Sequence, residues 1–254
     1  MLRRQAAAAR RRGETTMRTL GIIGSGNIGA AIARLAVAAG MDVVIANSRG
    51  PQSLDSLVAE LGPLATAGTS DEAAQAGEVV VLSIPLRAHP DVPADLLADK
   101  VVLDTTNYYP SRDGRIAALD AGELTTSELV QRHFADSALV KAFTNILAHH
   151  IPQLARPTGA ADRSALPLAG DDAAAKATAA ALLDRLGFDT VDAGSLADSW
   201  RFEPESAAYT RLYLADPSTP DEQLLQAPAG PRSSAEVLQA LRSAERVDVA
   251  ARVF

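Results

Sequence analysis

Hydrophobic residues along the chain fall into short continuous runs that alternate with stretches of helical periodicity. The runs 20–23, 42–46 and 78–84 are apolar through their middle, which is typical of strands buried on both faces of a parallel sheet. The stretch 30–39 between the first two is rich in small residues and stops at Gly40, which predicts a helix. This alternation predicts an α/β fold built on a Rossmann-type, doubly wound parallel sheet.

The same two patterns continue along the chain. Apolar runs predict further strands at 64–68, 100–104, 138–143, 165–170 and 188–194. Helical spacing and helix-start residues predict helices at 51–61, 92–97, 124–132 and 173–186, with a shorter one between 69 and 77.

The chain divides into four parts. Residues 1–16 form a basic extension whose apolar piece is too short for a signal peptide, and we expect it to be disordered. Residues 17–150 carry the Rossmann pattern, and residues 151–215 form a small C-terminal α/β part. From 216 to 254 the sequence is rich in Pro, Gly and Ser and predicts a mobile polar tail, with a short helix near 235–244.

A glycine-rich turn joins the first strand to the first helix, and it reads Gly24-Ser25-Gly26-Asn27-Ile28-Gly29. Gly24 permits a tight turn, Gly26 lets the backbone approach a pyrophosphate, and Gly29 lets the helix pack close to the strand. The bare pattern also occurs in turns without a ligand. The strands on either side favour dinucleotide binding, with the phosphates at the helix N-terminus.

The end of the second strand indicates which dinucleotide is bound. A site for NAD places Asp or Glu there to bind the ribose 2′-hydroxyl, but this chain has Asn47-Ser48-Arg49. Arg49 can bind a 2′-phosphate with paired N–H donors, and Ser48 can add a hydrogen bond. The alternative is a solvated loop arginine. The sequence therefore predicts NADP.

Two later strand ends are expected at the same rim. Ser83, Ile84, Pro85 and Leu86 follow the strand at 78–84 and should border the ribose or nicotinamide. Asn107 follows the next strand, where its side chain either binds the nicotinamide amide or stabilises the turn before a proline.

The adjacent histidines His149 and His150 suggest a metal, but no carboxylate lies at ligand spacing and we predict no metal site. Either imidazole could instead face the substrate or donate a proton.

Composition narrows the classes of function. The 254 residues contain no cysteine, which excludes disulfides, thiolate zinc sites and a cysteine nucleophile and fits a reducing cytoplasm. A net charge of −7 argues against nonspecific nucleic-acid binding. No apolar run approaches the roughly 20 residues that span a membrane. We therefore expect a cytoplasmic enzyme with a small-molecule partner.

Six motifs in one order resemble the coenzyme F420-dependent NADP oxidoreductase family. They are Gly24–Gly29, Asn47–Arg49, Leu82–Pro85, Val140–Phe143, Ala169–Asp172 and Asp192–Leu196. The resemblance covers roughly residues 17–205.

The resemblance implies a Rossmann domain that binds NADP, a small C-terminal part that closes over a flat deazaflavin, and a homodimer. The resemblance further implies that hydride passes directly between nicotinamide C4 and deazaflavin C5, with no side chain acting as a catalytic acid or base. By position, Ser25, Gly26, Asn27 and Ile28 hold the pyrophosphate, Ser48 and Arg49 hold the 2′-phosphate, Ile84, Pro85 and Leu86 lie along the nicotinamide riboside, and Ala142 faces the two rings.

The chain departs from this family at its end. The usual apolar helix after the Asp-Ala-Gly element is replaced by Trp200–Pro204 and a long polar tail. The candidates for contact with the hydride acceptor are Trp200, at this departure, and Thr144 and Asn145, which are close to Ala142 in the sequence.

Two alternatives remain open. One is an NADPH-dependent imine or carbonyl reductase, for which Thr144, His149 or Tyr108 would have to donate the proton. The other is a redox-sensing protein that binds NADPH without turnover.

Overall fold

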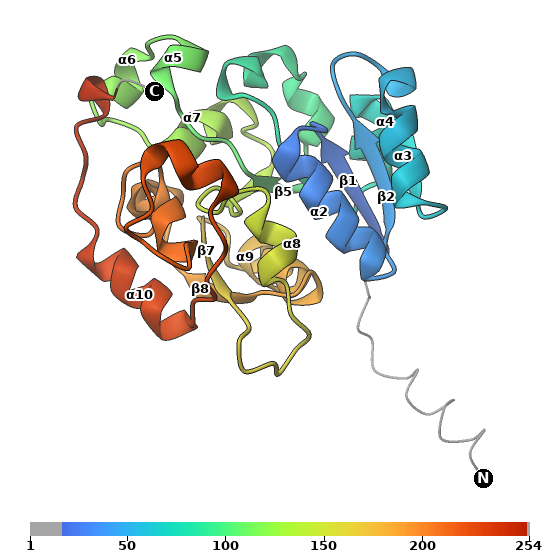
Figure 1. Ribbon diagram of the computed structural model, residues 1–254. Coiled ribbons are helices and arrows are strands. Elements are labelled where there is room, and N and C mark those ends of the chain that lie inside the picture. Colours follow the sequence, from blue (N-terminus) through green and yellow to red (C-terminus); the bar gives the residue numbers. More distant parts are fainter. Residues whose placement is uncertain (1–16, 253–254) are drawn as a thin grey trace.

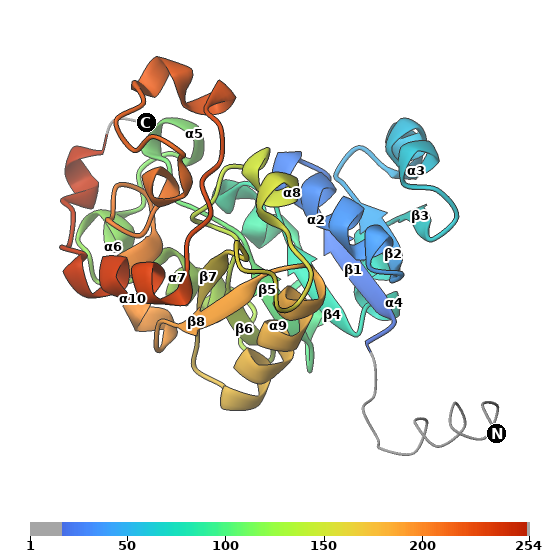
Figure 2. The same cartoon turned by 60° about the horizontal axis from the view of Figure 1, so that its bottom comes forward.

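The computed structural model describes residues 17–252, so the predicted disorder of residues 1–16 concerns a part of the chain outside the described residues. One twisted sheet of eight strands runs through the middle of the molecule, in the order β3-β2-β1-β4-β5-β6-β7-β8 (Figures 1 and 2). Its strands are β1 Thr19–Ile23, β2 Asp42–Ala46, β3 Ala65–Gly68, β4 Val79–Leu82, β5 Val101–Asp104, β6 Ala138–Lys141, β7 Ala165–Gly170 and β8 Asp189–Asp192.

The first six strands are parallel, which confirms the predicted α/β fold class. β7 pairs with β6 in the antiparallel direction, and β8 then runs parallel to β7. The C-terminal α/β part therefore extends the Rossmann sheet instead of forming a sheet of its own. The order reverses between β1 and β4, which is the switch point where ligands bind in open α/β sheets.

Helices connect the strands and cover both faces of the sheet. The α-helices are α2 Asn27–Ala38, α3 Asp55–Leu61, α4 Ser70–Ala76, α5 Pro110–Asp113, α6 Ala117–Asp120, α7 Thr126–His133, α8 His150–Leu154, α9 Ala173–Arg185 and α10 Ser234–Ser243. Short 3-10 helices are Pro51–Leu54, Leu86–Asp91, Ala94–Leu97, Leu196–Phe202, Thr210–Tyr213, Asp221–Gln226 and Val249–Ala251.

Alternating residues of each central strand serve two separate cores. In β4, Val79 and Val81 pack into the core that holds α2, α8 and α9, whereas Val80 and Leu82 pack into the core that holds α4 and α7. Burial on both faces explains why the central strands read as continuous apolar runs.

Of the helices predicted at 92–97 and 235–244, one differs in type from the structure and the other is present. The helix expected at 92–97 is a 3-10 turn over Ala94–Leu97, next to a second 3-10 turn that contains Pro90. Pro90 and Pro93 each lack a backbone N–H, so this stretch cannot form a continuous α-helix. The helix expected near 235–244 is α10.

The C-terminal segment, residues 203–252, folds back over the edge of the sheet and ends beside α5 and α6 (Figure 1). His149 and His150 both hydrogen-bond through Nε2 to the carbonyl oxygen of Ala227, at 3.0 and 2.8 Å. At the end of the segment, the buried Arg252 donates to the carbonyl oxygens of Tyr108 and Pro204. Within the predicted mobile polar tail, residues 216–254, Ala227 and Arg252 thus contact the loops that follow β5 and β6.

A buried ion pair joins this segment to the sheet. Lys141, at the end of β6, is fully buried and lies 3.1 Å from a carboxylate oxygen of Glu203. The same ammonium donates to the carbonyl oxygen of Thr106 and to Ser127 Oγ, each at 3.1 Å. A buried charge needs such partners, so the segment supplies the counter-ion that allows β6 to carry a lysine.

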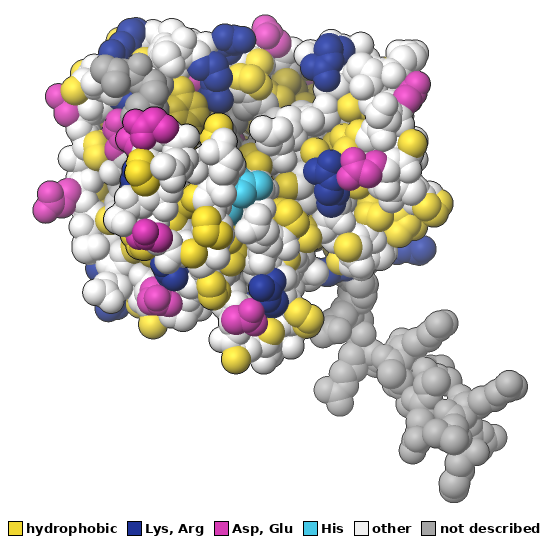
Figure 3. Space-filling view, in the orientation of Figure 1, with side chains coloured by type: hydrophobic (Ala, Val, Ile, Leu, Met, Phe, Trp, Pro, Cys, Tyr) yellow, Lys and Arg dark blue, Asp and Glu magenta, His cyan; other side chains and the backbone are white. Residues whose placement is uncertain are grey.

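Within residues 17–252, no helix is long and apolar enough to cross a lipid bilayer. Figure 3 shows that acidic and basic side chains are interspersed over the face in view, with apolar side chains between them.

Candidate functional site

The loops that could bind a ligand meet at one edge of the sheet. Because β1, β2, β4, β5 and β6 are parallel, their carboxyl ends all lie at this edge. Hydrogen bonds hold the loops in register: Gly24 N–H donates to Ala46 O at 2.9 Å, and Ser83 N–H donates to Ile23 O at 2.8 Å. The edge is therefore a fixed frame for a ligand.

The three fingerprint glycines have different surroundings. Gly24 has a φ of +113°, and a Cβ there would lie 2.0 Å from the carbonyl oxygen of Ser83. A Cβ on Gly29 would lie 2.0 Å from the carbonyl oxygen of Gly24, so α2 packs directly on the loop. A Cβ on Gly26 would meet nothing within 4 Å. Gly24 and Gly29 are thus required by the fold, whereas Gly26 borders open space.

The N-terminus of α2 opens on that space. Gly26 is the N-cap of this 12-residue helix, and no side chain caps the first turn. The unpaired N–H groups and the helix dipole favour an anion at this point. Together with the open side of Gly26, they fit the pyrophosphate of a dinucleotide.

The loop after β2 lies beside the glycine loop. Asn47 Nδ2 donates to Ser25 Oγ at 3.0 Å and thereby ties the two loops together. Ser48 and Arg49 are both exposed, and the Arg49 guanidinium forms no ion pair with any carboxylate of residues 17–252. This geometry fits the binding of a 2′-phosphate by Arg49.

These loops enclose a glycine-loop cleft of about 500 Å³. The predicted residues that line it are Gly24, Ser25, Gly26, Ser48, Arg49, Ser83, Ile84 and Pro85. A second cleft, the tyrosine cleft, has a volume of about 370 Å³. The predicted residues that line it are Gly26, Asn27, Ile28, Ser83, Ile84, Pro85, Asn107 and Thr144.

The two clefts share one wall, formed by Gly26, Ser83, Ile84 and Pro85. This wall follows β1 and β4, the strands at the switch point of the sheet. An elongated ligand can therefore lie with one end in each cleft and its middle over the N-terminus of α2.

A pair of tyrosines, for which the tyrosine cleft is named, stands at its far end. The hydroxyls of Tyr109 and Tyr209 form a short hydrogen bond, and Asn107 Nδ2 lies 3.5 Å from the Tyr209 hydroxyl. Burial raises the pKa of Tyr209 well above its usual value, and the adjacent Tyr109 raises that pKa further. Tyr209 therefore stays protonated and can act as a hydrogen-bond donor throughout the physiological pH range.

Other polar groups of the tyrosine cleft wall are incompletely paired. Asn107 donates through Nδ2 to the carbonyl oxygen of Thr144 at 2.7 Å, but Asn107 Oδ1 has no partner among the described residues. The hydroxyl of Thr144 is likewise buried without a partner there. Phe143 precedes Thr144 with a φ of +58°, an unusual backbone for a bulky residue. Strain and unpaired polar groups in a cleft are typical of functional sites.

Five predicted site residues, Gly29, Leu86, Ala142, Asn145 and Trp200, do not line either cleft. Leu86 and Ala142 are fully buried in the cores, and Asn145 is fully buried with its amide donating to Ala208 O at 2.8 Å. Asn145 therefore anchors the C-terminal segment. Trp200 lines a pocket elsewhere, as described below. Gly29 packs under the glycine loop and supports the site without lining a cleft.

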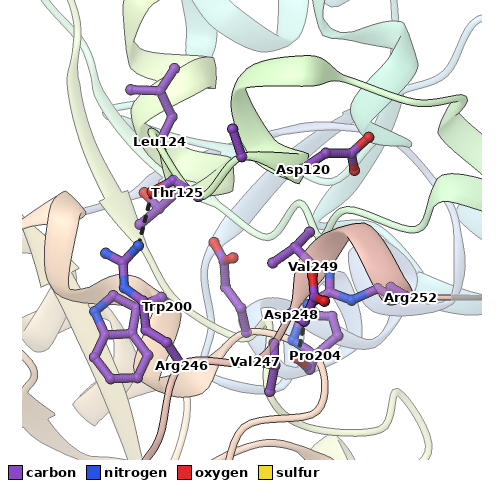
Figure 4. A pocket seen from close by; sticks show the side chains of 13 residues that line it. Asp120, Leu124, Thr125, Trp200, Pro204, Arg246, Val247, Asp248, Val249 and Arg252 are labelled. Atoms are coloured by element: carbon purple, nitrogen blue, oxygen red, sulfur yellow. Dashed lines mark hydrogen bonds between the residues drawn. The ribbon is translucent and has the colours of Figure 1, made fainter.

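Trp200 lies in a separate pocket of about 250 Å³, between α6 and the end of the C-terminal segment (Figure 4). The guanidinium groups of Arg201 and Arg246 lie 5.4 and 5.3 Å from the centre of its ring. Cation–π contacts thus hold the indole in place away from both clefts.

Two of the three proton donors considered from the sequence also lie elsewhere. The Tyr108 hydroxyl bonds to Asp120 and to the backbone N–H of Ile116, and its pKa is raised mainly by burial. His149 bonds to Ala227 O. Of the three, Thr144 lines the tyrosine cleft.

Sequence reasoning missed Tyr109, Tyr209 and Leu225, which all line the tyrosine cleft. The position of Tyr109, two residues after Asn107 at a strand end, could have indicated it. Tyr209 and Leu225 come from the C-terminal segment, where no periodicity or motif signals a site.

Comparisons with known proteins agree with this geometry. The model of the family "NADP oxidoreductase, coenzyme F420-dependent" matches residues 19–108, from β1 to the loop after β5. The solved structure of a hypothetical protein, SMa0349, from Sinorhizobium meliloti is 33% identical, with a TM-score of 0.62. That match covers 72% of this chain and 88% of the other.

Two further matches are more distant. A candidate F420-dependent NADP-reductase from Arthrobacter sp. FB24 is 24% identical, covers 72% of this chain and 87% of the other, and has a TM-score of 0.59, which shows the shared fold. Metalloreductase STEAP3 of Rattus norvegicus is 28% identical over 186 residues, which are 72% of this chain and 35% of the rat protein. The chain thus spans about a third of that relative's length. With the fingerprint loop, the strand order and these matches in agreement, the chain belongs to the family of coenzyme F420-dependent NADP oxidoreductases.

Proposed function

We propose that the protein transfers hydride between NADP(H) and a flat ring acceptor of the deazaflavin or flavin type, such as coenzyme F420. The observation that carries this proposal is the shared wall of the two clefts. It allows a dinucleotide in the glycine-loop cleft to extend its nicotinamide toward the tyrosine cleft, where a second ring can stack.

The residues present fit NADP. The open side of Gly26 and the uncapped N-terminus of α2 suit the pyrophosphate, and Arg49 suits the 2′-phosphate. Ser83, Ile84 and Pro85 would then border the nicotinamide riboside. When bound, the nicotinamide supplies the hydride chemistry.

The protein's part is orientation and exclusion of water. Phe143 and Ile146 give the tyrosine cleft apolar walls, and Pro85 limits where a ring can lie. The hydroxyls of Thr144 and Tyr209 can hold the polar edge of an acceptor by hydrogen bonds. Fixing two rings at reacting distance removes much of the entropic cost of a bimolecular step.

One observation favours a second candidate, the reduction of an imine or carbonyl. Such a reaction needs a proton donor beside the nicotinamide, and the Tyr109–Tyr209 pair offers hydroxyls in the tyrosine cleft. For ring-to-ring transfer, Tyr209→Phe should lower turnover by less than about tenfold. For imine or carbonyl reduction by Tyr209, the loss should reach about a hundredfold.

The test is to mix the purified protein with NADPH and oxidised F420, riboflavin, or a panel of imines and ketones, and to follow NADPH consumption. Saturable reduction of F420 or riboflavin supports the proposal. Reduction of imines or ketones alone supports the second candidate. Tight NADPH binding without turnover of any acceptor would contradict both and favour a redox sensor.

A further inference from the structure

One acidic side chain lines the glycine-loop cleft. Asp91 ends the 3-10 helix Leu86–Asp91 and is the one carboxylate among the described residues that line this cleft. It is exposed, and its side chain forms no ion pair or hydrogen bond with any other residue of 17–252. The uncapped N-terminus of α2 and the guanidinium of Arg49 both favour an anion in the same cleft. A carboxylate there works against phosphate binding unless the ligand also brings a hydrogen-bond donor to it.

In the proposed binding mode, each part of NADP(H) has its own place along the cleft. The pyrophosphate fits the open side of Gly26, and the 2′-phosphate fits Arg49. The nicotinamide half leaves along the wall that this cleft shares with the tyrosine cleft. The 2′-phosphate and the adenine are attached to neighbouring carbons of one ribose, so the base lies close to Arg49. The lining that remains for the base is Ser70, Ala88, Asp91 and Val92.

Hydrogen bonds fix the backbone on both sides of Asp91. On one side, His133 Nε2 bonds to the carbonyl oxygen of Val92 at 2.8 Å. On the other, Arg87 Nη1 donates to the carbonyl oxygen of Arg112 at 2.6 Å. The backbone of Asp91 is therefore held at the edge of the cleft before a ligand arrives, which lowers the cost of ordering this residue on binding.

The chemistry of adenine limits what Asp91 can bind. Ala88 and Val92 are apolar and can contact the face of the base, so the carboxylate of Asp91 is left for its edge. An ionised carboxylate accepts hydrogen bonds and donates none. The ring nitrogens of adenine are acceptors, and its 6-amino group is the hydrogen-bond donor of its edge. Asp91 can therefore pair with the 6-amino group alone.

We propose that Asp91 accepts a hydrogen bond from the 6-amino group of NADP(H), and that the protein thereby selects adenine over hypoxanthine in its cofactor. Hypoxanthine carries a carbonyl oxygen at this position, which a carboxylate repels, and its N1–H donor lies at the neighbouring ring atom. The inference rests on the NADP(H)-binding part of the proposed function. It does not depend on the identity of the hydride acceptor.

The test compares NADPH with reduced nicotinamide hypoxanthine dinucleotide phosphate, which has a carbonyl oxygen in place of the 6-amino group and keeps every phosphate. Isothermal titration calorimetry of the purified protein gives a Kd for each. The Kd for NADPH should be at least about fivefold lower. Because the phosphates are the same, the ratio of the two Kd values cancels any effect of charge on phosphate binding. Equal Kd values, or tighter binding of the hypoxanthine dinucleotide, would overturn the inference.

Two substitutions locate the source of the preference. Asp91→Asn should reduce the ratio to below about twofold, because a rotated amide offers either an oxygen to the amino group or an N–H to the carbonyl. Asp95→Asn removes the same charge from an exposed position of the next 3-10 helix, Ala94–Leu97, which does not line the cleft, and should keep the wild-type ratio. Both positions are exposed, so thermal unfolding should show that the two variants keep the wild-type Tm. An unchanged ratio in Asp91→Asn, or an equal change in Asp95→Asn, would overturn the inference.

The outcomes separate this inference from the proposed function. Both dinucleotides carry the 2′-phosphate, so Arg49→Ala should weaken the binding of both by about the same factor and keep their ratio. If the wild type binds neither dinucleotide, the proposed function fails and the inference fails with it. If the wild type binds both equally well, NADP(H) binding stands and the selection of the base by Asp91 fails.

Discussion

Replacing the three fingerprint glycines one at a time by alanine should separate cofactor binding from folding. A Cβ on Gly26 meets nothing within 4 Å, and the backbone there, with φ −68° and ψ −174°, suits any residue. Alanine is a poorer N-cap than glycine by roughly 0.5–1 kcal/mol. It also restricts the unfolded chain, which returns roughly 0.4–1 kcal/mol. The free energy of unfolding of Gly26→Ala should therefore change by less than about 1 kcal/mol.

The other two glycines should behave differently. In Gly24→Ala the residue must adopt a φ of +113°, at a cost of roughly 1–3 kcal/mol, and its Cβ would lie 2.0 Å from Ser83 O. The backbone shifts that relieve this overlap lower the free energy of unfolding by roughly a further 1–3 kcal/mol. In Gly29→Ala only the overlap of the new Cβ with Gly24 O lowers stability, because no positive φ is required there. A loss of 1 kcal/mol lowers Tm by about 2–4 °C for a chain of this size.

The affinity for NADPH should respond differently from stability: Gly26→Ala, which hardly changes stability, should strongly weaken NADPH binding. In the proposed binding mode the pyrophosphate lies over Gly26, so the new methyl of Gly26→Ala would displace it from the N-terminus of α2. Loss of one charge-assisted hydrogen bond costs roughly 1.5–3 kcal/mol. The Kd for NADPH should thus rise by about 10- to 150-fold.

The assay is differential scanning fluorimetry without ligand, followed by titration with NADPH. Two results would refute the reasoning. One is NADPH affinity of Gly26→Ala equal to that of the wild type, which would mean that the pyrophosphate does not pass over Gly26. The other is a Tm loss in Gly26→Ala as large as that in Gly29→Ala.

Three other predictions concern the cofactor, the buried ion pair and pH. Arg49→Ala should weaken the binding of NADPH by at least about tenfold, because a charge-assisted contact is lost, and the binding of NADH by less than about threefold. Equal losses of affinity for the two dinucleotides in parallel titrations would remove the basis for choosing NADP. Glu203→Gln leaves the buried ammonium of Lys141 without a carboxylate in contact and should lower the free energy of unfolding in urea by roughly 3–5 kcal/mol. Adding Lys141→Met to this variant should recover part of that loss. An unchanged free energy of unfolding in Glu203→Gln would contradict this prediction. Burial lowers the pKa of His150, so the unfolded chain binds this proton more readily. The free energy of unfolding, followed from pH 8 to pH 5, should therefore fall as pH drops below about 6.5, less so in His150→Gln; a pH dependence identical to that of the wild type would reject the role of His150.

The sequence predicted the Rossmann half well because its signals are local. Strand β4 is buried on both faces by helices on each side, and this leaves a continuous apolar run that can be recognised alone. The glycine loop is similar in part, since a Cβ on Gly29 would meet the carbonyl oxygen of Gly24 in the same loop, whereas Gly24 approaches the distant Ser83. Requirements of this local kind can be recognised in a short stretch of the sequence.

The tyrosine cleft could not be predicted in the same way because it is built from distant contacts. Tyr209 reaches its cleft because Asn145 binds Ala208 O and because the histidines after β6 bind Ala227 O. Such long-range hydrogen bonds leave no periodicity in the sequence. The departure from the family predicts an acceptor contact at Trp200, but arginine stacking holds this side chain in another pocket.

The buried pair of Lys141 and Glu203 also bears on how the chain is made. During synthesis β6 leaves the ribosome well before Glu203 does, and until then Lys141 has no carboxylate partner from the C-terminal segment. Full docking of β6 as a charged strand is therefore costly in a nascent chain that stops short of Glu203. The strands β1 to β5, which carry the glycine loop, have no such dependence. We expect ribosome-bound chains to acquire protease resistance in two stages, the second after Glu203 has emerged.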